Sequence, residues 1–262
     1  MAWTTSGELE RTANAIEGGN VLSGRNRVTP PLIFLSKRNE VELIKIEKTE
    51  TYGWEAAIRG MRNPLNSWKK SDSYFSDEEF VVGENDLGLM KRLRDAGTDH
   101  RKYLRMIMVS CDIVAPLYWW KEFDTYKVGT VANSCSTMHK IQAKEFTLDD
   151  FSFDKLRDEQ VAWKSSGQGQ DEELSSLEFA QIICDVLNGA REHYLKTKDK
   201  TYWWQMIQLL PSSYNQKRTA TLNYEVLANM YKSRKNHKLD EWHEFCDWIE
   251  TLPHSELITG KY

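Results

Sequence analysis

The sequence has few cysteines, and none of the four lies at the short spacing that zinc sites and disulfide-rich domains use. We therefore predict reduced thiols, with Cys111 and Cys184 inside apolar runs and hence in the core. The six histidines are equally scattered. His237 and His243 are six residues apart, so they cannot share a helix face with a carboxylate as metal ligands, and we predict no metal site.

Long apolar runs and a basic excess are also lacking. No run reaches the roughly 18 residues of a membrane-spanning helix, and the first residues lack the apolar core of a signal peptide. The net charge of -4 argues against broad nucleic-acid binding, although it does not exclude a local basic pocket. With 40% hydrophobic and 28% charged residues, the composition is that of a folded globular protein. We expect a cytoplasmic protein without a membrane partner.

The chain shows no long linker and no internal repeat. Residues 1–33 are polar, end at Pro30-Pro31 and are predicted to form an N-terminal extension, whereas residues 34–262 are predicted to form a single domain. Helices and strands are expected without regular alternation, which favours an α+β fold. The expected strands are 41–46, 104–113 and 217–222, and the expected loops are 63–79 and 148–173. Helices are expected from 53 and over 84–96, 116–127, 174–195, 200–210, 224–234 and 240–252.

Ten tryptophans are many for a chain of this size, and four of them form the pairs Trp119-Trp120 and Trp203-Trp204. Such large apolar rings usually complete a core or a subunit interface. The alternative is stacking on a flat ring of a ligand.

Arg234 follows Leu227 and Met230 at helical spacing, so it shares their apolar face. A guanidinium on such a face needs a negative partner, because an unpaired buried charge is costly. An anionic ligand would supply that partner. Alternatively, Arg234 belongs to the cations that complement the carboxyl end of a helix. Both interpretations stay open.

The uncharged stretch 128–137 has features that suit a phosphate. Gly129 allows close backbone approach, and hydroxyl groups surround it (Thr130, Ser134, Ser136 and Thr137). The alternative is a plain loop that caps the next helix. On the preceding helix, Glu122 and Tyr126 are four residues apart and form either a polar pair facing a pocket or an exposed pair.

The carboxy-terminal quarter carries an ordered set of motifs. Leu209-Leu210-Pro211 is followed by Thr221-Leu222-Asn223, then by Arg234 and Trp242. This order and spacing resembles the signature of the flavin-dependent thymidylate synthases. Asn133 and Ser136 keep the spacing of a second motif of that family, with Lys127 as the nearby cation.

The resemblance implies an α+β homotetramer whose active sites form between subunits. It implies FAD as cofactor and a dUMP-like pyrimidine nucleotide as ligand, which the protein would methylate or otherwise modify. The residues implied to bind nucleotide or cofactor are Lys127, Asn133, Ser134, Ser136, Asn223 and Arg234.

The chain departs from the family at several cationic positions. The family's Arg-His-Arg triplet is missing, Met138 stands where the motif ends in Arg, and Ile207 replaces the Arg before the Leu-Pro pair. Two functions therefore compete: an enzyme acting on a pyrimidine nucleotide, and a non-catalytic homologue that binds or sequesters a nucleotide or nucleotide-derived signal. A purely structural oligomer is a third alternative.

Overall fold

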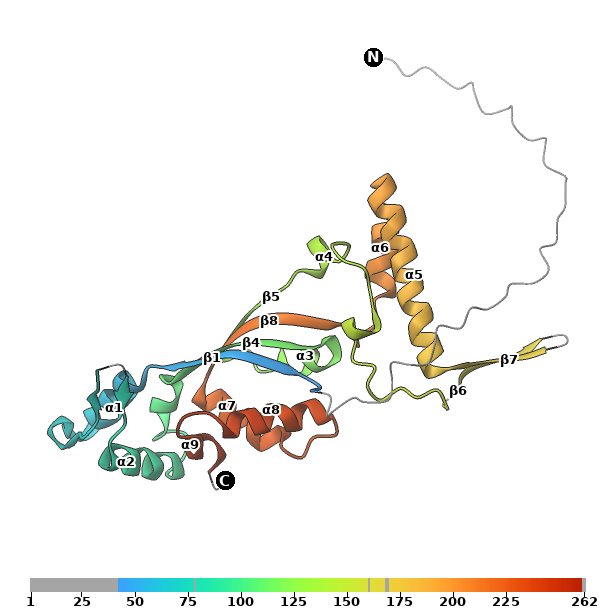
Figure 1. Ribbon diagram of the computed structural model, residues 1–262. Coiled ribbons are helices and arrows are strands. Elements are labelled where there is room, and N and C mark those ends of the chain that lie inside the picture. Colours follow the sequence, from blue (N-terminus) through green and yellow to red (C-terminus); the bar gives the residue numbers. More distant parts are fainter. Residues whose placement is uncertain (1–41, 78, 160, 168–169, 261–262) are drawn as a thin grey trace, which may run out of the picture. The chain divides into compact units, whose positions relative to one another are not determined.

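A four-stranded antiparallel sheet, in the order β1-β4-β8-β5, organises the protein (Figure 1). The computed structural model describes residues 42–77, 79–159, 161–167 and 170–260. The strands are β1 (Lys45–Tyr52), β4 (Met108–Pro116), β5 (Thr130–Ser134) and β8 (Asn215–Asn223). Residues 1–33, predicted to be an extension, lie outside the described residues.

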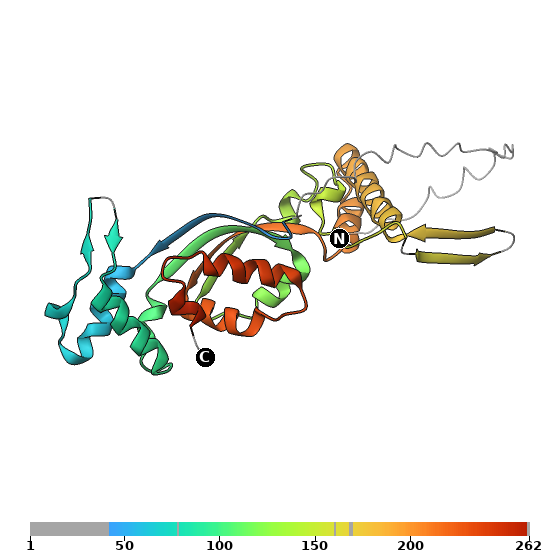
Figure 2. The same cartoon turned by 60° about the horizontal axis from the view of Figure 1, so that its bottom comes forward.

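The two central strands show the alternation that a half-buried sheet requires. In β4, Val109, Cys111 and Ile113 point into the core, whereas the intervening Ser110 and Asp112 lie on the opposite, polar face. The helices that cover the apolar face are α3 (Leu117–Phe123), α7 (Tyr224–Arg234) and α8 (Asp240–Glu250), as Figure 2 shows. The sheet therefore has one buried face and one polar face.

Tryptophan rings fill the space between the sheet and its helices. Trp119 and Trp120 are fully buried, and the Trp119 ring centroid lies 4.7 Å from that of Trp242 on α8. This confirms a core role for the first tryptophan pair. The second pair is divided: Trp203 packs against a separate cluster, whereas Trp204 is exposed.

Helix α1 (Trp54–Arg62) follows β1 directly and packs with α2 (Glu84–Asp95). The connection between them contains the short 3-10 helices η1 (Asn63–Leu65) and η2 (Trp68–Lys70) and a small hairpin of β2 (Tyr74–Phe75) and β3 (Phe80–Val81). Another 3-10 helix, η3 (Lys102–Arg105), precedes β4, and α9 (Glu256–Thr259) follows α8.

A second hydrophobic cluster holds a helical hairpin of α5 (Ser176–Thr197) and α6 (Lys200–Leu209). Its buried members include Cys184, Leu187 and Met206, together with Phe146 and Phe151. Along the chain, four elements separate β5 from α5. They are α4 (Thr137–Lys140), η4 (Leu148–Asp150) and the paired strands β6 (Val161–Gly167) and β7 (Gln170–Ser175).

The α+β class is confirmed, as are the helices at 84–96, 200–210, 224–234 and 240–252 to within a few residues. Several expectations were wrong in part. The stretch 63–79, expected as loop, contains η1, η2 and β2, and the helix expected over 116–127 ends at Phe123. The first strand begins four residues later than 41, and the strand expected over 104–113 starts only at Met108, because Tyr103 and Leu104 enter the core as a 3-10 turn. Part of 148–173, expected as loop, forms the β6–β7 pair.

Cys111 and Cys184 are buried free thiols, as expected. Desolvation by burial raises the pKa of Cys111 to about 12 and that of Cys184 to about 11, so both stay protonated. Among the described residues, no group of three or more His, Cys, Asp or Glu side chains is placed to hold a metal ion. None of the described helices combines the length and apolar character needed to cross a membrane.

A buried ion pair fixes the connection between α1 and α2. Arg62 donates from Nε to Oδ1 of Asp86 at 2.6 Å, and both side chains are almost completely buried. The second oxygen of Asp86 accepts hydrogen bonds from the hydroxyls of Ser71 and Ser73 at 2.6 and 2.7 Å. Asp86 thus anchors the connection to the start of α2.

We expect Asp86→Ala to lower the free energy of unfolding by about 3–5 kcal/mol, because Arg62 would remain buried without its partner. The matched control is Glu55→Ala, which removes an exposed ion pair with Arg59 on the same helix and should cost less than about 0.5 kcal/mol. Urea unfolding of both variants measures the difference. Equal effects would show that the buried pair does not anchor this region.

Candidate functional site

Arg234, the last residue of α7, faces α3 rather than solvent. Its Nη1 donates to Oε2 of Glu122 at 2.5 Å, and its Nε donates to the Tyr126 hydroxyl at 2.9 Å. Its guanidinium carbon also lies 4.8 Å from the centroid of the Trp242 ring. The negative partner considered for Arg234 is therefore a carboxylate of the same chain.

Glu122 is shared by three donors. Besides Arg234, the indole nitrogen of Trp242 donates to Oε2 at 3.1 Å, and Nε2 of His237 lies 3.3 Å from the same oxygen. Glu122 and Tyr126, considered as a polar pair from the sequence, both accept hydrogen bonds from Arg234. This closed cluster ties α3 to α7 and α8.

Asn223 ends β8 and caps α7. Its Oδ1 accepts a hydrogen bond from the backbone N–H of Val226 at 2.9 Å, and the side chain is buried. Gly129 lies directly against it: with a φ of +86°, a Cβ at this glycine would come within 2.5 Å of Asn223 Nδ2. Only glycine allows the turn before β5 to approach so closely. Lys127 is exposed on this turn.

The stretch 128–137, for which a plain loop was one alternative, contains β5. Its residues are almost all exposed because β5 is an edge strand that pairs only with β8. A strand whose side chains stay exposed at the edge of a sheet needs no apolar alternation, so 128–137 carries no strand signal. Asn133 and Ser134 lie on this edge, opposite Thr219 and Arg218. Ser136 then caps α4, accepting from the backbone N–H of His139 at 3.2 Å, as the loop-and-cap alternative proposed.

The six residues predicted to bind a ligand thus fall in two groups along β5. Lys127, Asn223 and Arg234 lie near the turn that precedes the strand, whereas the other three lie at or just beyond its far end: Asn133, Ser134 and Ser136. A strand rises about 3.4 Å per residue, so the two ends are separated by roughly 13 Å. One chain does not gather all six residues around a single phosphate.

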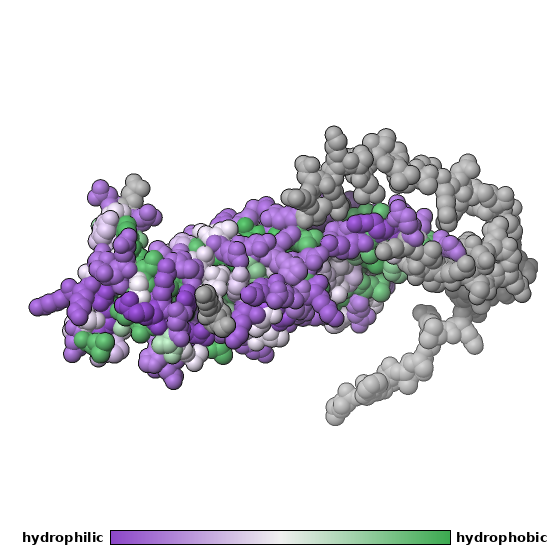
Figure 3. Space-filling view, turned by 90° about the horizontal axis from the view of Figure 1, so that it is seen from below, coloured by the Kyte–Doolittle hydropathy of each residue, from purple (hydrophilic) through white to green (hydrophobic). Residues whose placement is uncertain are grey.

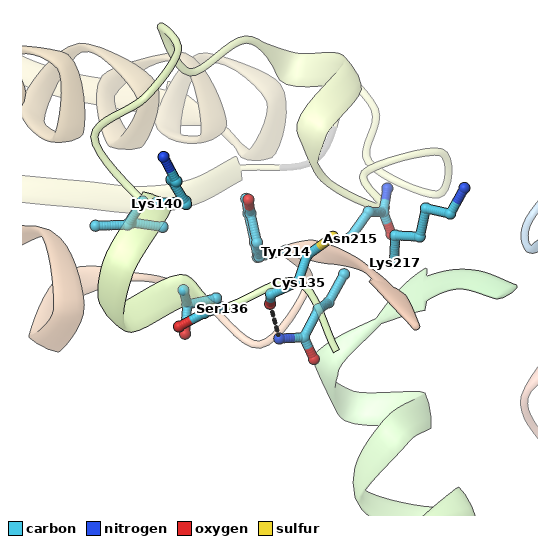
Figure 4. A pocket seen from close by; sticks show the side chains of 9 residues that line it. Cys135, Ser136, Lys140, Tyr214, Asn215 and Lys217 are labelled. Carbon is cyan, nitrogen blue, oxygen red and sulfur yellow. Dashed lines mark hydrogen bonds between the residues drawn. The ribbon is translucent and has the colours of Figure 1, made fainter. Parts of the chain in front are cut away.

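A cavity of about 80 Å³ lies at the far end of β5. Its lining comes from the start of α4 and from β8, with Cys135, Ser136, Lys140, Tyr214 and Lys217 among the lining residues (Figure 4). A pocket for a whole small molecule usually measures about 300–1,000 Å³. The volume therefore suits one group of a ligand, such as a phosphate.

The cavity wall is held by hydrogen bonds of the main chain and of Gln216. Nε2 of Gln216 donates to the Cys135 carbonyl at 2.8 Å, drawn as the dashed line in Figure 4. Burial raises the pKa of Tyr214, which keeps its phenol protonated and able to donate. Sequence reasoning identified Ser136 but missed Lys140, Tyr214 and Lys217, which no local pattern connects to it.

The cations near β5 differ in whether a carboxylate already holds them. Arg218 pairs with Asp124 at 2.8 Å, Lys217 with Asp112 at 2.9 Å and Arg234 with Glu122. Lys127 and Lys140 have exposed side chains and no ion pair with any described residue. A new anion is attracted most by a cation that is not already neutralised, so these two lysines are the strongest candidates for ligand binding.

Asp112 organises the polar face of the sheet beside the cavity. It accepts from the Thr219 hydroxyl at 2.6 Å and pairs with Lys217. The hydrogen bonds from Thr219 and Lys217 lower the pKa of Asp112 from 3.8 to about 2. The same contact with Asp112 raises the pKa of Lys217, which therefore stays charged.

Two solved structures share this fold. A flavin-dependent thymidylate synthase ThyX from Helicobacter pylori, complexed with FAD and dUMP, superimposes with a TM-score of 0.58 at 13% identity over 82% of this chain and 97% of that chain. A second structure of Helicobacter pylori ThyX with FAD and dUMP gives a TM-score of 0.56 at 14% identity, over 82% and 96%. No protein-family model and no curated protein matches the sequence. At 13–14% identity, the similarity to these two structures establishes the fold of this chain.

We expect Arg234→Ala to lower the free energy of unfolding by about 1–3 kcal/mol, because it removes charge-assisted hydrogen bonds to Glu122 and Tyr126. In the Arg234→Ala background, Glu122→Ala should lower the free energy of unfolding by less than it does in the parent protein. We expect a coupling of about 0.5–3 kcal/mol between the two sites. Chemical denaturation of both single variants and the double variant gives this coupling. Strictly additive effects would show that the ion pair contributes nothing to folding.

We expect the Asp112 carboxylate to make stability depend on acid. Its pKa is lower in the folded protein than in the unfolded chain, so its contribution is present above about pH 4 and is lost as the pH falls towards 2. Asp112→Asn should therefore reduce stability at neutral pH and flatten its dependence on pH between about 4 and 2. Denaturation series at several pH values test this, and parallel curves for parent and variant would contradict it.

Proposed function

We propose that this protein binds a pyrimidine nucleoside monophosphate of the dUMP type, with the phosphate in the cavity between α4 and β8. The observation that carries the proposal is the cavity at Ser136, with the unpaired Lys140 beside it. The fold supports it, because the two ThyX structures with this fold were complexed with dUMP.

The charge of the cavity suits a monophosphate. Lys140 supplies an uncommitted ammonium, Lys217 a second positive charge shared with Asp112, and Tyr214 a neutral donor. The Ser136 hydroxyl, whose oxygen caps α4, retains its own proton for donation. The base and sugar would extend beyond a cavity of this size, so their binding requires further residues, on this chain or on another subunit of the predicted homotetramer.

FAD fits the described donors of one chain less well. Of the cations near β5, Arg218 at the far end and Arg234 at the first end each contact a carboxylate, whereas the exposed Lys127 pairs with no described residue. We therefore derive no chemical step through a flavin. Because Met138 and Ile207 also replace family arginines, we propose nucleotide binding as the retained function, with thymidylate synthesis weak or absent.

We expect calorimetric titration with dUMP to show binding that Lys140→Ala weakens at least tenfold, because a charge-assisted hydrogen bond contributes about 1.5–3 kcal/mol. Ser136→Ala removes a second residue of the cavity lining. Because it also removes the cap of α4, the folding of this variant is checked separately. Lys69→Ala, an exposed lysine on η2 outside the cavity lining, is the matched control. Failure of the parent protein to bind dUMP, or unchanged affinity in Lys140→Ala, would refute the proposal.

Catalysis is tested on the same preparation. The visible spectrum of the purified protein reports bound flavin, and a turnover assay with dUMP, methylene-folate, reduced nicotinamide and added FAD reports thymidylate synthesis. We expect dUMP to bind without added flavin and product to form slowly or not at all. Robust flavin-dependent product would establish an enzyme and contradict the assignment of binding as the retained function.

A further inference from the structure

The second tryptophan pair, on α6, is not fully used by the core. The ring centroids of Trp203 and Trp204 lie 4.8 Å apart, at an interplanar angle of 71°. Trp203 packs against the second hydrophobic cluster, whereas Trp204 is 43% exposed. An exposed apolar side chain is normal by itself, and Figure 3 shows green residues scattered among predominantly hydrophilic ones. Trp204 is therefore distinguished by its position in the fold.

A hydrogen bond joins this pair to α4, the short helix beside the phosphate-sized cavity. Nε1 of Trp203 donates to the carbonyl oxygen of Met138 at 3.2 Å, and Figure 1 shows α4 beside α6. Met138 lies in α4 between Ser136 and Lys140, which both line the cavity. A helix rises about 1.5 Å per residue, so Met138 is about 3 Å from Ser136 along the axis. The cavity and the tryptophan pair thus adjoin the same helical turn.

Packing also connects the cavity to the tryptophan pair. Ile141 and Tyr214 line the cavity and belong to the second hydrophobic cluster, against which Trp203 packs. The wall of the cavity and Trp203 are therefore parts of one packed unit. The helix α6 fixes Trp204 next to Trp203, so the position of Trp204 relative to the cavity is set by this packing.

Lys200, at the start of α6, adds a positive charge to the ring pair. Its ammonium lies 5.8 Å from the ring centroid of Trp203 and 5.7 Å from that of Trp204. Such a cation–π contact holds the ammonium beside the rings. Among the residues that the structure describes, no carboxylate forms an ion pair with Lys200. The ring pair therefore combines a flat apolar surface with a hydrogen-bond donor at its edge.

A uracil base requires these two features. A cavity of about 80 Å³ suits the phosphate, so the base must lie outside it. Aromatic side chains bind bases by stacking, because every base has a flat π-face. Uracil also has two carbonyl oxygens at its rim, and an ammonium beside the ring can donate to one of them.

We propose that the base of a pyrimidine nucleotide, with its phosphate in the cavity, passes over α4 and stacks on the indole of Trp204. Lys200 donates to a carbonyl oxygen of the base, and Trp203 positions the ring pair through its hydrogen bond to Met138. This inference rests on the proposed function. It adds the residues that make the ligand a nucleotide rather than a simple phosphate ester.

Calorimetric titration with dUMP and with 2-deoxyribose 5-phosphate tests the stacking, because the second ligand has the same phosphate and sugar but no base. We expect Trp204→Ala to weaken dUMP binding at least about fivefold, as the loss of one stacked base does. The affinity for deoxyribose 5-phosphate should be unchanged, whereas Lys140→Ala should weaken the binding of both ligands. The matched control is Trp68→Ala on η2: Trp68 is 49% exposed and lies outside the cavity lining, so neither affinity should change.

Trp204→Phe is the second variant, because it keeps a ring at this position. It should bind dUMP nearly as the parent does, but the quenching of tryptophan fluorescence by dUMP should be reduced. Thermal unfolding checks that each variant folds. Unchanged dUMP affinity in Trp204→Ala, equal weakening of both ligands, or undiminished quenching in Trp204→Phe would overturn the stacking and leave the phosphate cavity in place. A parent protein that binds neither ligand would refute the proposed function, and this inference with it.

Discussion

The antiparallel pairing of β4 with β8 is the constraint on which the rest of the structure depends. It is continuous from Met108 opposite Asn223 to Pro116 opposite Asn215. A shift by one residue would turn Val109, Cys111 and Ile113 to the polar face and Asp112 into the core. The register therefore determines which face receives the tryptophan-rich helices and which carries Asp112, Thr219 and Lys217.

The same register places both ends of the candidate site. Asn223 ends β8 and begins α7, so it brings the turn at Gly129 against the helix that carries Arg234. At the other end, Lys217 and Gln216 of β8 meet Cys135 and Ser136 after β5. The strand β5 contributes few apolar contacts of its own and depends on β8 for its position.

Charge neutralisation separates residues that hold the fold from residues that remain available to a ligand. Arg234, Arg218 and Arg62 are each engaged by a carboxylate of the same chain, and these contacts connect elements far apart in sequence. Lys140 and Lys127 make no such contact with the described residues. A basic residue is more available to a ligand when the structure leaves its charge unpaired, and this distinction favours the cavity beside Lys140 over the cluster around Arg234.

The sequence by itself determined the α+β class, most helices and the core positions of Trp119, Trp120, Cys111 and Cys184, because helical and strand periodicities are local and burial follows them. It also offered a negative partner as one of two interpretations of Arg234. Only the tertiary structure decided that this group is Glu122, that 128–137 contains an edge strand, and that Ser136 lies beside Lys140, Tyr214 and Lys217. These outcomes depend on contacts between residues some 75 to 110 positions apart, except for Lys140, and no local pattern encodes which distant carboxylate or strand a residue will meet.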